Sequence, residues 1–240
     1  MIKLLLTVRL SWYFFGAFAL FFGLSTLVDG ATFSPAVLTL FSVNSFLYGF
    51  YIAPILGAQK TRIDEMGKSI RAEANAIFDI LIQSKALPRR SQTIVQDLCE
   101  EYLDASFRER KPPQGEYEYE RLISYCLEYR GKDPDTIKLI LDKLIQNQQH
   151  RSQLAMQLEN KVFHNEWWIM LVLFSITIGF VVFLNTPDQP VLHVVKALLC
   201  TGLTMLMLSL LKLSTLTHKR AKNIWQPLDT LKTSRFRRID

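Results

Sequence analysis

Apolar residues in this chain are gathered into four blocks and do not alternate with polar residues as they do in a soluble domain. The blocks cover roughly residues 10–28, 36–58, 167–184 and 191–213. At about 1.5 Å per residue in a helix, each block is long enough to cross the hydrocarbon layer of a bilayer, which is about 30 Å thick. The pattern predicts an all-α integral membrane protein with four transmembrane helices. The first block follows Lys3 and Arg9 as a signal peptide would, but "STLVDGATFS" offers no small-x-small cleavage site, so we expect it to remain as a membrane helix.

Basic residues flank these blocks on one side only. They precede the first block, follow the second and follow the fourth, whereas the connections around Asp29 and "NTPDQP" contain no Lys or Arg. Because positively charged loops stay in the cytoplasm, both termini and the central segment are predicted to be cytoplasmic. A short chain without a transit peptide favours a bacterial inner membrane as the location.

The segment 59–166, between the second and third blocks, has the pattern of amphipathic helices. Apolar residues recur there at steps of three and four and form one stripe, beginning with Ile63, Met66, Ile70, Ala74, Ile77 and Leu81. Little interrupts helix formation between residues 58 and 86, and from Thr136 the pattern continues into the third block as one long helix or two nearly collinear ones. The chain is therefore expected to divide into a membrane helix pair (1–58), a helical cytoplasmic domain (59–166), a second membrane pair (167–213) and a basic tail (214–240).

The formal charge of +6 comes mainly from the tail, in "HKRAK" and "SRFRR", because acidic and basic residues nearly balance within 59–166. A basic tail beside a membrane is expected to contact anionic lipid head groups, so the lipid bilayer is a predicted partner and nucleic acid is not.

Residues that carry enzymatic chemistry are scarce. The four histidines are scattered. The first three blocks contain no His, Asp, Glu, Lys or Arg, and the fourth has His193 and Lys196 near its outer end. No phosphate-binding glycine loop, HExxH or GxSxG motif is present. "EYEYE", at 116–120, is expected to be a solvated surface and not a cation site. The three cysteines have no metal-ligand spacing, so we expect no enzymatic activity, no metal site and no cofactor.

One stretch of the second block, "NSFLYGFYIAP" (44–54), contains residues that lipid does not favour. On a helix, Ser42, Phe46 and Phe50 share one face. Gly49 permits a close backbone approach, and Pro54 predicts a bend because it cannot donate to a backbone carbonyl. The polar residues of the stretch either hold this helix against its neighbours or line a water path, and the pattern leaves both open.

The same stretch resembles a known family. "SFLYGFYI" is similar to the second membrane helix of bestrophin chloride channels, in which a Ser-Phe and a Gly-Phe-Tyr occur in the same order. "RAEANAIFDIL", "ALP" and "LCEEYLDASFRER" resemble the bestrophin-like family of membrane proteins, whose members carry a Glu-Ala-Asn after helix two, a Leu-Pro, and a helix with a central Tyr. The topology, with a helical segment between two membrane pairs, is also similar.

The resemblance implies a homo-oligomer, a pentamer in bestrophins, in which helix two surrounds a central pore for inorganic ions. Phe46 and Phe50 would form the constriction, with Ser42 where bestrophins have an apolar residue. The positive edges of phenylalanine rings favour a partly dehydrated anion such as chloride. The Arg-Trp dipeptide, the acidic calcium clasp and the Pro-Phe expected from these families are absent, so calcium gating is not expected.

The predicted function is an oligomeric, bestrophin-like, anion-conducting channel. Lys60 and Arg62 would raise the anion concentration at the inner mouth of the pore, although the acidic residues that follow them leave cation selectivity open. Lys196, near the outer end of the fourth block, would either snorkel to the membrane surface or carry a positive charge at the outer mouth. The alternative is a membrane-anchored scaffold that binds a partner and has no ion path, in which Phe46 and Phe50 pack against the other membrane helices.

Overall fold

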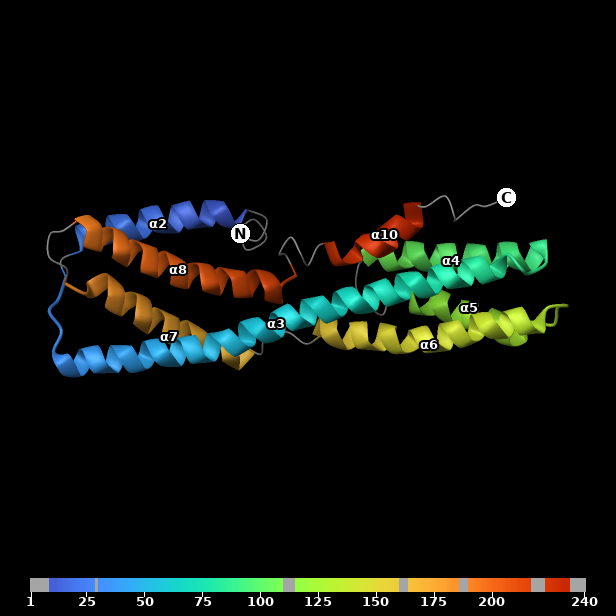
Figure 1. Ribbon diagram of the computed structural model, residues 1–240, viewed down its shortest axis with the longest axis horizontal. Coiled ribbons are helices and arrows are strands. Elements are labelled where there is room, and N and C mark those ends of the chain that lie inside the picture. Colours follow the sequence, from blue (N-terminus) through green and yellow to red (C-terminus); the bar gives the residue numbers. More distant parts are fainter. Residues whose placement is uncertain are drawn as a thin grey trace. The chain divides into compact units, whose positions relative to one another are not determined.

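The computed structural model describes residues 9–28, 30–109, 115–159, 164–185, 190–216 and 223–233, and these residues are predominantly helical (Figure 1). By contacts the chain divides into two compact units. The membrane unit comprises Met1–Thr61 and Lys161–Ala221, and the amphipathic unit comprises Arg62–Asn160 and Lys222–Asp240. The elements in chain order are α2 (Leu10–Leu27), α3 (Pro35–Ser84), α4 (Arg89–Glu109), α5 (Glu116–Glu128), α6 (Pro134–Glu159), α7 (His164–Phe183), α8 (Pro190–Ser214), the 3₁₀ turn η1 (Asn223–Trp225) and α10 (Gln226–Thr233).

Four of the described helices, namely α2, α3, α7 and α8, are long and apolar enough to cross a membrane. This confirms the predicted all-α class and places the candidate membrane helices at the four apolar blocks. The helix of the second block continues to Ser84 without a break, as expected. After Thr136, helix α6 ends at Glu159 and α7 begins at His164. The residues between them lie outside the described part of the chain, so one long helix or two nearly collinear ones stays a prediction.

The core of the membrane unit lies where α3, α7 and α8 meet. Its buried members are Tyr48, Ile52, Met170, Met207 and Leu210. Helix α2 packs along α8, where the ammonium of Lys212 lies 5.0 Å from the centre of the Tyr13 ring. Many large apolar side chains of these helices are exposed, as expected of a surface in contact with lipid or with another subunit.

The two connections without basic residues are joined to each other by backbone hydrogen bonds. The Ala31 amide donates to the Phe183 carbonyl at 2.8 Å, and the Asn185 amide donates to the Ala31 carbonyl at 3.1 Å. Gly30 lies so close to Asn185 that an added Cβ would be 2.3 Å from its Cα. These contacts tie the start of α3 to the end of α7, and the Phe33 and Phe41 rings stack on Phe180 in the same region.

The amphipathic unit is built around the predicted apolar stripe. Ile63, Met66, Ile70 and Ile77 are all buried, as are Ala74 and Leu81. Apolar residues of the other helices of the unit are buried as well, including Val95, Leu98, Leu122, Ile140 and Leu144. Helix α10 contacts α4, and Lys232 pairs with Asp104 there at 2.8 Å. Most of the basic residues of the tail lie outside the described residues, so its predicted lipid contact stays a prediction.

Candidate functional site

Two faces of the apolar part of α3 have different surroundings. Phe46 and Phe50 are 68% and 69% exposed, and their rings stack with centroids 5.9 Å apart. Ser42 lies on the same face, and its hydroxyl donates to the Leu38 carbonyl of its own helix at 3.0 Å. Within the described single chain this face is therefore available to another molecule.

The polar residues of "NSFLYGFYIAP" point mainly to the packed face. The Asn44 amide donates to the Thr177 hydroxyl at 2.8 Å and to the Leu173 carbonyl at 3.2 Å, both on α7. Tyr48 is buried in the core, and its ring lies beside Phe174. Asn44 and Tyr48 thus hold α3 against α7, whereas Phe46 and Phe50 are exposed within the described part of the chain. The packing of Phe46 and Phe50 that the scaffold alternative expects is absent from the described residues.

Gly49 and Pro54 have no special contact inside the described chain. A Cβ added at Gly49 would meet nothing within 4 Å, so the close approach expected there is not made by the described part of this subunit. Helix α3 stays helical across Pro54, and the bend at this residue stays a prediction.

Lys196 is buried at the end of α7. Its ammonium donates to the carbonyls of Val182 at 3.1 Å and Leu184 at 2.8 Å. The last carbonyls of a helix have no intrahelical partner and carry partial negative charge, so an ammonium is a favourable cap. Lys196 therefore joins the end of α7 to α8.

Arg62 has a similar role in the amphipathic unit. It is buried, and its guanidinium donates from Nε to the Gln157 carbonyl at 2.5 Å and from a terminal nitrogen to the Leu158 carbonyl at 3.3 Å. These carbonyls belong to the last turn of α6. Of the three basic residues predicted at the pore mouths, only Lys60 is exposed.

The amphipathic unit contains a polar cluster, which we define as Glu73, Tyr102, Glu116, Tyr119 and Arg151, and all of these except Glu116 are buried. The Tyr102 hydroxyl donates to the Glu73 carboxyl, and Glu73 is only 4% exposed. Burial raises the pKa of Glu73 above its ordinary value, against the opposing effects of the Tyr102 hydrogen bond and the Arg151 charge. Glu73 and Tyr102 belong to two of the motifs that carry the family resemblance, and the fold brings them into direct contact.

Arg151 completes this cluster from α6. Its guanidinium carbon lies 3.9 Å from the centre of the Tyr119 ring and 5.3 Å from that of Tyr102. A terminal nitrogen of the same guanidinium lies 2.8 Å from the Glu116 carboxylate. The expectation that "EYEYE" is a solvated surface is therefore wrong for Tyr119, which is fully buried, whereas Glu116 stays partly exposed while it pairs with Arg151.

Sequence reasoning missed Arg151, which lies in the polar run "QNQQHR" and carries no recognisable motif. The sequence did contain a signal for it. Arg151 follows the buried residues Ile140, Leu144 and Asn147 at steps of three and four, so it lies on the same face of the helix. Among the residues that the structure describes, no group of three or more His, Cys, Asp or Glu is placed to hold a metal ion.

Comparison with known families agrees with the motifs. Residues 10–216 match the family described as the Bestrophin-like domain. No curated protein and no solved structure matches the chain. The match covers all four candidate membrane helices together with α4, α5 and α6.

Proposed function

The chain belongs to the bestrophin-like family, and from this premise we propose that it is one subunit of a homo-oligomeric ion channel whose central pore is lined by the apolar part of α3. The family is one of bestrophin-type channels, and the four apolar helices mark a membrane protein. Both points favour a channel over an enzyme.

The observation that carries the proposal is the exposed pair Phe46 and Phe50. A single unit of four packed helices encloses no water path, so a pore needs several copies around an axis. The residues that hold α3 to α7 and α8 lie on a different face from these phenylalanines. This arrangement leaves the phenylalanine face free to meet the same face of other subunits.

Rings of Phe46 and Phe50, repeated around the axis, would narrow the pore and exclude water when closed. The hydrogen-bearing edge of each ring carries partial positive charge, so edges pointing to the axis favour an anion. Lys60 is exposed on α3 and would add to the anion concentration near the pore. We therefore propose anion conduction, with chloride as the first ion to test.

The proposal also covers the membrane and the orientation of the chain in it. We place both termini and the amphipathic unit in the cytoplasm of a bacterial cell, with the membrane unit in the inner membrane. The support is the absence of Lys and Arg from the connections around Asp29 and "NTPDQP".

Replacing Phe50 tests the pore directly. We expect Phe50→Ala to raise the anion conductance of the purified protein in planar bilayers severalfold, because a smaller ring of side chains removes part of the constriction. Phe15→Ala is a matched control, since Phe15 on α2 is 67% exposed, nearly the same as Phe50. Phe15→Ala should leave the conductance unchanged. Equal conductance in well-folded Phe50→Ala and wild-type protein would contradict the pore assignment and favour the scaffold alternative.

A further inference from the structure

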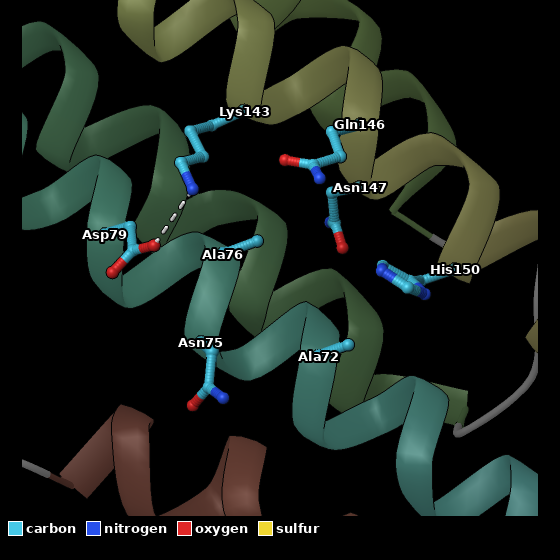
Figure 2. Close-up of a pocket in the computed structure, with 8 residues that line it drawn as sticks. All are labelled: Ala72, Asn75, Ala76, Asp79, Lys143, Gln146, Asn147 and His150. Carbon is cyan, nitrogen blue, oxygen red and sulfur yellow. Dashed lines mark ion pairs between the residues drawn. The ribbon is translucent and has the colours of Figure 1, made fainter.

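The amphipathic unit contains a pocket of about 190 Å³ between α3 and α6 (Figure 2). Two alanines of α3, Ala72 and Ala76, form one wall without filling it. The remaining lining side chains are polar or charged, and they are Asn75, Asp79, Lys143, Gln146, Asn147 and His150. Asn75 is the asparagine of the Glu-Ala-Asn motif, so a residue that carries the family resemblance lines this pocket.

Asn147 supplies an unsatisfied hydrogen-bond acceptor to the pocket. Its side chain is only 1% exposed, and its Oδ1 has no hydrogen-bond partner among the described residues. A buried amide oxygen without a hydrogen-bond donor is unfavourable, so such an atom needs a partner. Figure 2 shows this oxygen directed into the space between Ala72, Ala76 and His150.

Hydrogen bonding determines the orientation of the Asn147 amide. The Tyr119 hydroxyl donates to the Leu144 carbonyl at 2.7 Å, so its oxygen can only accept from Asn147. The Asn147 Nδ2 accordingly donates to Tyr119, at 3.3 Å. Flipping the amide would place two acceptors against each other. Oδ1 therefore faces the pocket, and a ligand there must bring a hydrogen-bond donor.

The charges around the pocket define the ligand further. Asp79 and Lys143 lie at one end, 3.5 Å apart and each partly exposed, which makes a weak pair that a ligand can separate at little cost. A simple anion would meet Asp79 and the Asn147 oxygen, and a simple cation would meet Lys143. An apolar ligand would leave the Asn147 oxygen without a donor. A molecule that carries one positive and one negative charge pairs with Asp79 and Lys143 at the same time.

We propose that this pocket binds a small zwitterion of amino-acid size. The ammonium donates to Asn147 Oδ1 and Asp79, and the carboxylate accepts from Lys143 and from a nitrogen of His150 or Gln146. A volume of about 190 Å³ holds several waters and suits an amino acid with a short side chain. This site goes beyond the proposed channel activity, and its occupancy is measured without ion flux, so either proposal can fail alone.

The binding test uses the full chain purified in detergent. Glycine, L-alanine, L-serine and L-threonine are the probes, measured by saturation-transfer NMR and by the ligand-induced rise in unfolding temperature. Ethylamine, propionate and glycerol are the comparison compounds, with one charge or none. We expect at least one amino acid to bind with a millimolar or lower Kd, at least tenfold more tightly than every comparison compound. No binding of the four amino acids up to 50 mM, or equal binding of a comparison compound, overturns the proposal.

Variants locate the binding at this pocket. Ala76→Leu fills the space from α3 and should weaken binding at least tenfold, whereas Ala155→Leu on α6, outside the pocket lining, should not. Asp79→Asn, at the partly exposed end, removes one charge without opening the core and should also weaken amino-acid binding about tenfold. Unchanged affinity in Asp79→Asn, or equal affinity in the two alanine variants, places the ligand elsewhere and overturns the assignment.

Discussion

Glu73 is a carboxylic acid held away from water in the core of the amphipathic unit. Its carboxyl accepts from the Tyr102 hydroxyl, while Arg151 lies against the rings of Tyr102 and Tyr119 and pairs with Glu116. Burying a carboxylate is costly unless it is paired, so the raised pKa of Glu73 and its hydrogen-bond donor belong to one arrangement.

Removing the Tyr102 hydroxyl should show how much its hydrogen bond to Glu73 stabilises the protein. Tyr102→Phe leaves a buried carboxyl oxygen without its partner and should destabilise the protein by about 1–3 kcal/mol. Tyr117→Phe is the control, because Tyr117 lies on the neighbouring helix α5 and is 68% exposed. Denaturant unfolding in detergent measures both. A Tyr102→Phe protein as stable as Tyr117→Phe would show that the hydrogen bond contributes nothing.

The raised pKa of Glu73 also predicts the pH dependence of stability. Between the unfolded pKa of about 4.3 and the higher folded pKa, the folded state binds more protons than the unfolded state. Stability attributable to Glu73 is therefore fully present below the unfolded pKa and is lost as the pH rises through the folded pKa. Glu73→Gln should remove this part of the slope in unfolding measured from pH 4 to pH 8. Parallel pH profiles for the two proteins would contradict the prediction.

At the scale of elements, helix ends in this protein are joined to other elements by specific contacts. Lys196 of α8 caps α7, Arg62 of α3 caps α6, and Ala31 pairs with Leu184 between the two connections of the membrane unit. Each contact satisfies backbone carbonyls that a helix cannot satisfy alone. Lys196 and Arg62 lie near the ends of predicted membrane helices, and in the structure they contribute to helix packing. The positive-inside rule would use such residues only to assign the orientation of the chain in the membrane.

At Gly30, the contact with Asn185 leaves no space for a side chain. Gly30→Ala should lower the unfolding temperature clearly, because its Cβ would clash with the Asn185 backbone, which cannot move without breaking the pairing with Ala31. Gly179→Ala on α7 is the control, since a Cβ there meets nothing within 4 Å and alanine favours a helix. Scanning fluorimetry in detergent compares them. Equal unfolding temperatures would show that the two connections do not pair.

At the scale of the whole molecule, the pore role that we propose for the exposed Phe46 and Phe50 requires an assembly of several subunits. We expect native mass spectrometry of the detergent-purified protein to give a closed ring of about five subunits. Phe15→Ala should form the same ring, because it changes a different helix. A monomer or dimer that persists in lipid nanodiscs would rule out an axial pore and favour the scaffold alternative.

The sequence by itself determined the number and position of the apolar helices, the buried stripe from Ile63 to Leu81, and the family. These features depend on local composition and on periodicity along one helix, which are readable in order along the chain. Only the tertiary structure decided which polar residues of α3 face α7, that Arg62 and Lys196 cap other helices, and that Arg151 stacks between residues of α4 and α5. The partner of a polar side chain depends on how helices far apart in the chain pack together, and the periodicity along one helix carries no information about that packing.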